Sequence, residues 1–300
     1  MVDVRDEALR SGLFAHLAQL VSRSADGTVR SADVNGLQFE GRPFQVIGQQ
    51  GIRKVAGLEA ALSFTTVYRP PGADRPYDDQ IGDDGLVRYK YRGNDPEHPD
   101  NRALRVAMLD RRPMAYFVGV APGVYVPQFP VYLVAEDRSS LEFSVALDEA
   151  QSMIDVRDLS ELEKRTMMRL TLQRLDQTTF RSQLLIAYQR ECALCRLRYV
   201  DLLDAAHILP YSDPRSRAVV PNGLLLCKIH HAAFDKHIVG IRPDLGVEVR
   251  ADVLAAEDGP MLRHGLQELD GARVIPPRSR HDRPDEGWLH ERYQTFRQAG

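Results

Sequence analysis

The chain has 300 residues, of which 43% are hydrophobic and 27% charged, as in an ordinary soluble globular protein with room for two domains. Three cysteines exclude a disulfide scaffold, and neither a membrane-length apolar run nor a signal-peptide pattern is present, so we expect a cytoplasmic protein without membrane contact. The net charge of −3 gives only weak support to nucleic-acid binding, but the charge is unevenly distributed.

Residues 1–30 are predicted to form an N-terminal helical segment. Apolar residues recur at helical spacing around Leu9–Val21, which favours a packing or dimerisation helix over a membrane helix.

Residues 31–150 are predicted to form one β-rich domain. Short alternating runs, rich in aromatic residues, are separated by Gly, Pro, Asn and Asp, which is the pattern of strands joined by turns. The strands are expected at Leu62–Tyr68, Val87–Tyr91, Met114–Val118 and Val131–Val134. The loops Arg69–Gly85 and Gly93–Asn101 are rich in Asp and Glu, so they are unsuited to binding phosphate.

Residues 151–179 are predicted to be a helical linker, and residues 180–300 a third domain with a C-terminal extension. Leu159–Leu175 has apolar residues at helical spacing with Ser160 as the N-cap, and Phe180–Arg190 is expected to be a second helix. From Arg157 to Arg198 the chain holds nine Lys or Arg and five Asp or Glu. Contacts with phosphate are therefore expected along this stretch.

Two pairs of soft metal ligands follow the linker. Cys192 and Cys195 are spaced as in a turn that directs two thiolates at one ion, and Cys227 and His230 repeat that spacing with a nitrogen donor. These four residues predict a structural Zn²⁺ site. The alternatives are two buried thiols or a redox pair, and a zinc finger without catalytic activity.

A second set of polar residues in the same segment contains no thiolate. His207, Asn222, His231 and Asp235 suit a hard cation such as Mg²⁺ or Mn²⁺ together with a scissile phosphate. The spacing of His231 and Asp235 places both on one helical face, which makes them the expected ligands of a catalytic divalent ion. His237 is interpreted as a solvated residue at a helix end.

The segment from Cys192 to Asp235 resembles the HNH endonucleases, which have a ββα-metal fold. The resemblance implies that His207 is the general base, that Asn222 orients it and that His231 is the final histidine of the motif. Many members of the family have an acid immediately before the general base, where this chain has Ala206. The complete set of catalytic metal ligands therefore stays open.

The β-rich domain resembles the SRA domain, a PUA-like module that flips modified cytosine out of duplex DNA. The resemblance is carried in order by Gly51–Gly57, Pro76–Asp79, Tyr89–Gly93 and Asn101–Leu104. It implies a modified-base pocket in which two aromatic rings enclose the base and a carboxylate accepts from its exocyclic amine. The pocket residues would be the rings of Tyr77 and Tyr91 and the carboxylate of Asp79, or of Asp78 in a shifted register. The alternative is that the tyrosines are ordinary core aromatics and the acids a solvated turn.

We therefore predict an α+β protein with an N-terminal PUA/SRA-like curved sheet or barrel, a helical linker and a C-terminal HNH domain with structural zinc. The resemblances imply a modification-dependent DNA endonuclease, similar to type IV restriction enzymes that attack foreign DNA such as that of phages. It would recognise 5-methylcytosine or 5-hydroxymethylcytosine in double-stranded DNA by base flipping. Cutting both strands requires two nuclease domains, so a homodimer is expected. The alternatives are a non-catalytic, zinc-stabilised DNA-binding protein and an HNH nuclease indifferent to methylation.

Overall fold

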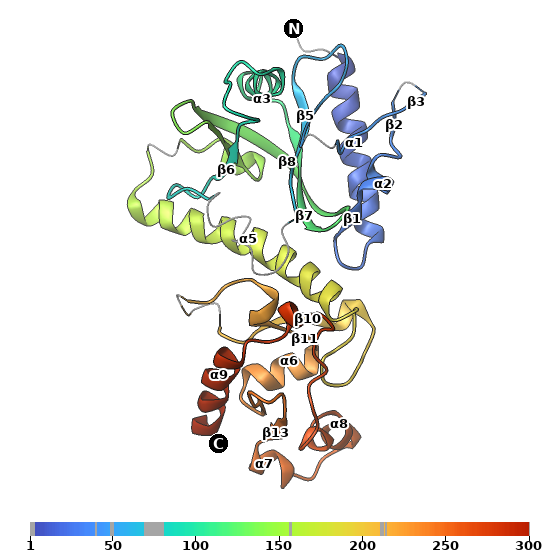
Figure 1. Ribbon diagram of the computed structural model, residues 1–300, viewed down its shortest axis with the longest axis vertical. Helices are drawn as coiled ribbons and strands as arrows, with labels where there is room; N and C mark the ends of the chain where they lie inside the picture. The colour runs from blue at the N-terminus through green and yellow to red at the C-terminus, as the bar shows by residue number, and fades with distance from the viewer. Residues whose placement is uncertain are drawn as a thin grey trace. The chain divides into compact units, whose positions relative to one another are not determined.

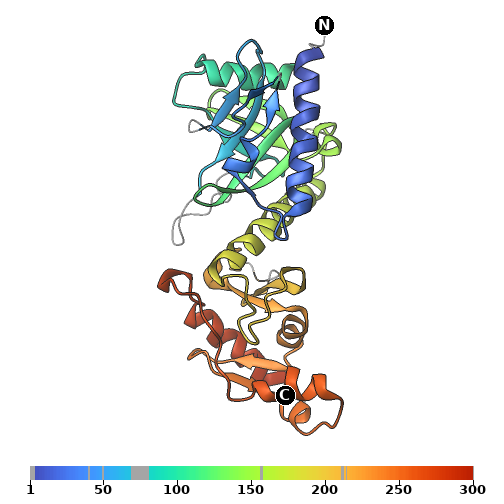
Figure 2. The same ribbon diagram turned by 90° about the vertical axis from the view of Figure 1, so that its right-hand side faces the viewer.

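The structure is a computed structural model that describes residues 4–39, 41–48, 51–68, 81–155, 158–210, 213 and 215–299. The chain divides into two compact units, Met1–Thr179 and Phe180–Gly300. Both units combine helices with strands, so the chain has the predicted mixed α+β class (Figures 1 and 2). No helix within the described ranges is long and apolar enough to span a membrane.

A curled sheet forms the centre of the first unit (Figure 1). In sheet order its strands are β4 (Ile52–Lys54), β5 (Ala61–Thr66), β7 (Met114–Ala121), β8 (Val124–Asp137), β9 (Glu142–Ala146) and β6 (Val87–Lys90), and β1 (Val29–Arg30) pairs with β8. β5 and β7 are parallel, whereas the other pairs are antiparallel. The long strand β8 pairs with both β7 and β9 and shifts register between Leu133 and Ala135. Such a shift bends a strand, and here the sheet curls into a half-barrel.

The helices of this unit lie on the two faces of the sheet. They are α1 (Val4–Arg23), α2 (Ser31–Val34), α3 (Pro99–Leu109), α4 (Glu149–Ser152) and part of α5 (Glu161–Ala187), and a small hairpin joins β2 (Gln38–Phe39) to β3 (Arg42–Pro43). Side chains of β7 alternate between two cores. Phe117 packs in the core that contains the buried stripe of α1, and Tyr116 packs in the core that contains α3.

Helix α5 is continuous over 27 residues, so the prediction of two separate helices at Leu159–Leu175 and Phe180–Arg190 was wrong. The residues between the two predicted helices include neither Gly nor Pro, so nothing in them interrupts the hydrogen bonds of the helix. The N-terminus agrees with the prediction. The Ser160 backbone N–H donates to Glu163 Oε2 at 2.8 Å, and the Glu163 N–H donates to Ser160 Oγ at 3.4 Å, which is a reciprocal capping box.

A hairpin followed by a helix forms the centre of the second unit. β10 (Leu203–His207) pairs antiparallel with β11 (Gly223–Cys227), and α6 (Lys228–Asp235) packs against both strands. The remaining elements are the 3₁₀ turns η1 (Val200–Leu202), η2 (Val220–Asn222), η3 (Gln267–Leu269) and η4 (Arg280–Asp282), the hairpin β12 (Val239–Ile241) and β13 (Val247–Val249), and the helices α7 (Ala251–Leu254), α8 (Pro260–Gly265) and α9 (Glu286–Ala299). This ββα unit brings the sequence-predicted ligands onto neighbouring elements.

Candidate metal and active sites

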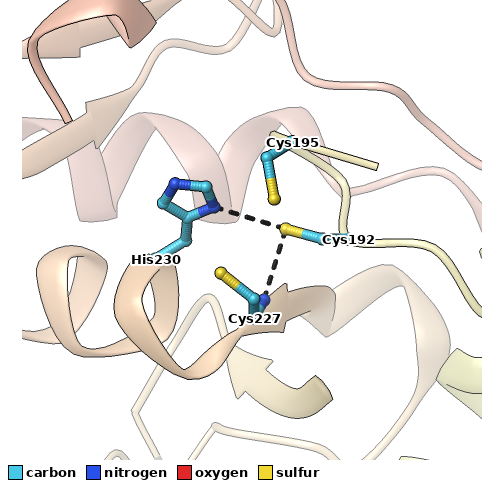
Figure 3. Close-up of side chains that lie close together, drawn as sticks. All are labelled: Cys192, Cys195, Cys227 and His230. Atoms are coloured by element: carbon cyan, nitrogen blue, oxygen red, sulfur yellow. Dashed lines mark hydrogen bonds between the residues drawn. The ribbon is translucent and has the colours of Figure 1, made fainter. Parts of the chain in front are cut away.

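Three cysteines and a histidine converge between the end of α5 and the start of α6 (Figure 3). The ligand atoms of Cys192, Cys195, Cys227 and His230 all lie within 4.8 Å of one another. Cys192 Sγ is 3.4 Å from His230 Nδ1 and accepts a hydrogen bond from the backbone N–H of Cys227 at 3.2 Å. These four are the residues that the sequence predicted as one set.

Backbone contacts hold the two ligand pairs against each other. The turn of Cys192 and Cys195 is joined to β11 because the Ala193 N–H donates to Leu225 O at 2.7 Å. Cys227 is the N-cap residue of α6, and His230 lies in the first turn of that helix. This hydrogen bond therefore holds the turn of Cys192 and Cys195 beside strand β11, which ends at Cys227.

The donor set fits Zn²⁺ and not a redox pair. Tetrahedral Zn²⁺ with ordinary bond lengths places sulfur and nitrogen ligands about 3.5 Å apart, which agrees with the 3.4 Å between Cys192 and His230. The Nε2 atom of His230 lies 2.8 Å from Gly265 O, so Nε2 carries the proton and leaves Nδ1 to face the thiols. This is the orientation that a zinc-binding imidazole requires.

The thiols also influence one another's protonation. Hydrogen bonds from Cys195 and Cys227 hold the pKa of Cys192 well below its ordinary value, against the effect of burial. Burial lowers the pKa of His230, but its hydrogen bonds to Cys192 and Cys227 outweigh burial and raise the pKa to about 10. Binding of a metal ion to these residues therefore displaces protons.

A second cluster combines two carboxylates with one imidazole. His231 Nδ1 lies 3.5 Å from Asp204 Oδ2, and His231 Nε2 lies 3.3 Å from Asp235 Oδ2. Lys228 Nζ is 3.0 Å from the other oxygen of Asp204. Burial raises the pKa of Asp204, but hydrogen bonds from Lys228 and His231 outweigh it and lower the pKa. Asp204 lies at one nitrogen of the His231 ring and Asp235 lies at the other, so a divalent cation could be held by His231 together with one of the two carboxylates.

Asp204 was missed by the sequence analysis, which considered only the position of Ala206. Side chains of a strand alternate between its faces, so Asp204 and Ala206 share one face of β10. The resemblance predicts an acid at position 206, and Asp204 instead supplies a carboxylate on that face of the strand, two residues earlier. The alternation of side chains between the two faces of a strand is the signal that could have identified Asp204.

His207 and Asn222 lie at the end of the hairpin where the connecting loop joins its two strands. The ring of His207 stacks on Phe180 of α5, with 4.3 Å between the ring centroids. Asn222 is fully buried; its Oδ1 accepts from the Leu209 N–H at 2.9 Å and its Nδ2 donates to Arg217 O at 2.9 Å. The amide of Asn222 thus fixes the backbone that follows His207.

Arg292 of α9 contacts the C-terminal end of α6. Its guanidinium carbon lies 4.7 Å from the centre of the Phe234 ring, and its Nη2 donates to Phe234 O at 3.1 Å. The same nitrogen lies 3.4 Å from Asp235 Oδ1. Arg292 is 57 residues from Asp235 in sequence, so no local pattern identifies this contact.

The residues predicted for the modified-base pocket are only partly described. Tyr77, Asp78 and Asp79 lie outside the described residues. Tyr91 is largely buried, with its ring 5.1 Å from the ring of Phe143.

The hydroxyl of Tyr91 belongs to a charged network in the first unit. It donates to Glu136, and the same carboxylate accepts from Arg105 Nε at 2.8 Å and from Arg105 Nη2 at 2.7 Å. Burial and the bond to Glu136 raise the pKa of Tyr91. The structure therefore fixes the orientation of Tyr91, and its stacking role stays a prediction.

Comparison with known proteins agrees with this geometry for the second unit. A family model described as an HNH endonuclease matches residues 192–242, a range that contains both clusters. Among solved structures the chain is similar to a "Modification dependent TagI restriction endonuclease", with 17% identity, a TM-score of 0.28, and coverage of 82% of this chain and 85% of that chain. No curated protein matches the chain in sequence. Residues 192–242 therefore form an HNH endonuclease domain, and this domain makes the protein a nuclease.

Proposed function

We propose that the protein is a modification-dependent DNA endonuclease that hydrolyses phosphodiester bonds at the hairpin and helix of its second unit. The observation that carries this proposal is that the second unit holds two separate groups of candidate metal ligands, and helix α6 contributes residues to both. Cys192, Cys195, Cys227 and His230 form a closed set with four soft donors, which suits structural Zn²⁺. His231, with Asp204 at one ring nitrogen and Asp235 at the other, offers oxygen and imidazole donors that suit Mg²⁺ or Mn²⁺.

In the proposed reaction His207 is the general base. An imidazole titrates near neutrality, so His207 can take a proton from the attacking water, while Asn222 holds the backbone beside it. A divalent ion held by His231 together with Asp204 or Asp235 would supply Lewis-acid stabilisation of charge on the phosphate. The zinc-binding residues would maintain the fold without entering the reaction.

The first unit is proposed to recognise modified cytosine. The curled sheet and the four sequence segments that resemble SRA domains support this role, with Tyr77, Tyr91, Asp78 and Asp79 as the proposed pocket. Flipping a base costs a few kcal/mol of unstacking, which stacking on aromatic rings and hydrogen bonds offset. Because one catalytic site cuts one strand at a time, we propose that two copies of the chain act together on duplex DNA.

Digestion of matched duplexes tests both parts of the proposal. The duplexes carry cytosine, 5-methylcytosine, 5-hydroxymethylcytosine or glucosylated cytosine, with Mg²⁺ and Mn²⁺ compared. Cleavage confined to modified duplexes is expected. Equal cleavage of modified and unmodified DNA would instead support a nuclease indifferent to methylation.

Matched variants assign the residues. His207→Ala should lower the cleavage rate about 10²- to 10⁴-fold, whereas His264→Ala, at an exposed histidine paired with Glu268, should leave it unchanged. Wild-type cleavage by His207→Ala would contradict the assignment of the base. Tyr77→Ala should remove discrimination between modified and unmodified DNA, while Tyr199→Ala, at an exposed tyrosine of the second unit, should preserve it.

A further inference from the structure

An exposed basic loop lies beside the proposed active site. It runs from residue 276 to residue 285 and is here named the arginine loop; its exposed basic residues are Arg278, Arg280, His281 and Arg283. Within the part of the chain that the structure describes, Arg278, Arg280 and Arg283 have no carboxylate within ion-pair distance. Other arginines of the same unit are neutralised, as Arg215 is by Glu291 at 2.7 Å.

The loop is anchored at both ends to the nuclease site. Immediately before it, the Ile275 N–H donates to Ala193 O at 2.8 Å, within the turn that carries the zinc-binding cysteines. At its far end the Asp285 N–H donates to Pro221 O at 2.9 Å, one residue before Asn222. The 3₁₀ turn η4 in the loop contacts η2, which leads directly into β11. The cations therefore lie near the end of the hairpin that carries His207.

The backbone of the loop is preorganised. Three prolines restrict it, and two of them, Pro277 and Pro284, are buried. The Asp282 N–H donates to Ser279 O at 3.2 Å. A loop that is already ordered loses little conformational entropy when it binds a ligand, so its exposed arginines can contact an anionic surface at low cost.

In the described part of the chain, neither acid of the loop forms an ion pair with its arginines. Asp285 Oδ1 accepts from the Trp288 N–H at 2.9 Å and so caps α9. Asp282 is partly buried and helps to raise the pKa of the buried Tyr188, after the larger effect of burial itself. The Tyr188 hydroxyl in turn donates to Gly223 O at 3.1 Å. The exposed charge of the loop is therefore dominated by the arginines.

We infer that the arginine loop binds the sugar-phosphate backbone of duplex DNA and thereby places the scissile phosphate beside Asp204, His231 and Asp235. The inference rests on the proposed endonuclease function and adds to it the surface that holds the substrate. Each arginine that contacts a phosphate displaces condensed counterions from the DNA, which increases the magnitude of the slope of log K against log salt concentration by about 0.9. Three such contacts give a slope contribution of about 2.7.

The experiment measures DNA binding by the zinc-loaded full chain carrying His207→Ala, which prevents cleavage. The probe is a duplex with 5-methylcytosine, titrated at several salt concentrations. The test variant adds Arg278→Gln, Arg280→Gln and Arg283→Gln. The control variant removes the same charge at three ion-paired arginines, through Arg242→Gln, Arg263→Gln and Arg297→Gln.

The test variant should bind about ten- to a hundredfold more weakly near 0.1 M salt, with the slope reduced by about 2.7, while the control keeps the wild-type slope. Lysine at all three loop positions should preserve the slope, because lysine also neutralises phosphate. Should the triple variant fail to retain zinc, each single glutamine variant should lower the slope by about 0.9.

Two results would overturn the inference, and they are distinguishable. Equal slopes for the test variant and the control, with wild-type protein still binding and cutting DNA, would remove the loop from the interface and leave the endonuclease proposal intact. A wild-type protein that neither binds nor cuts any duplex would remove both.

Discussion

Replacing Gly223 by alanine should disturb His207, the proposed general base, through the residues that contact it. A Cβ atom at Gly223 would lie 2.6 Å from the ring of Phe180 and 2.8 Å from Leu184, whereas ordinary contacts exceed about 3.4 Å. Phe180 must therefore move by roughly 1 Å, and it is the residue on which the His207 ring stacks. Gly223 also pairs directly with His207 across the hairpin, so the substitution affects both the strand neighbour of His207 and the ring on which its imidazole stacks.

The expected cost is about 1–3 kcal/mol of unfolding free energy, as for other overpacked cores. A displacement of about 1 Å in a catalytic group can lower the rate by about a hundredfold. Denaturant unfolding gives the first quantity, and the rate of duplex cleavage at saturating DNA gives the second. The control is Gly259→Ala, because a Cβ at Gly259 meets no atom within 4 Å.

Gly223→Ala with wild-type stability would show that Phe180 and Leu184 do not pack on β11 as described. A destabilised variant that still cleaves at the wild-type rate would show that the stacking of Phe180 on His207 does not position the base.

Three other perturbations have clear expected outcomes. Asp204→Asn should reduce activity and weaken binding of Mn²⁺ measured directly by titration, because it removes a carboxylate that lies beside His231. Cys227→Ser should abolish zinc binding and the cooperative unfolding of the second unit while the first unit keeps its own transition in calorimetry. Hydrogen bonds from Arg105 lower the pKa of Glu136, so its contribution to stability is present above the pKa of the unfolded state and is lost as pH falls through the folded-state value. Denaturation measured against pH should therefore show an acid-side loss of stability that Glu136→Gln reduces.

The candidate metal ligands could be grouped from sequence where they lie close together in the chain. Cys192 and Cys195 need only a turn, and Cys227 and His230 need only the start of a helix, so spacing was sufficient to group them. Asp204 was missed although strand alternation places it on the same face as Ala206. Arg292 was beyond the reach of any pattern, because its contact with Asp235 exists only once α9 packs in the second unit.

The first unit shows a different limit. The strands were predicted because alternation and turn residues are local, but a sequence does not tell whether an aromatic residue of a strand faces a cavity or the core. Tyr91 packs near Phe143 and bonds to Glu136, a partner 45 residues away on β8. The two-helix prediction failed for a local reason. A short polar interval in α5 resembles a break but has no residue that ends a helix.

Helix α6 carries residues of both proposed metal sites. Its consecutive residues are about 100° apart around the helix axis, so His230 can face the zinc-binding thiols while His231 faces Asp204 on β10. The zinc ligands fix the first turn of this helix, and Arg292 fixes its last turn by binding Phe234 O and the carboxylate of Asp235. Loss of zinc and loss of Arg292 therefore act on opposite ends of the same short helix. Either change should move His231 and Asp235 although it removes neither residue, so we expect both the proposed zinc site and Arg292 to influence the proposed cleavage reaction.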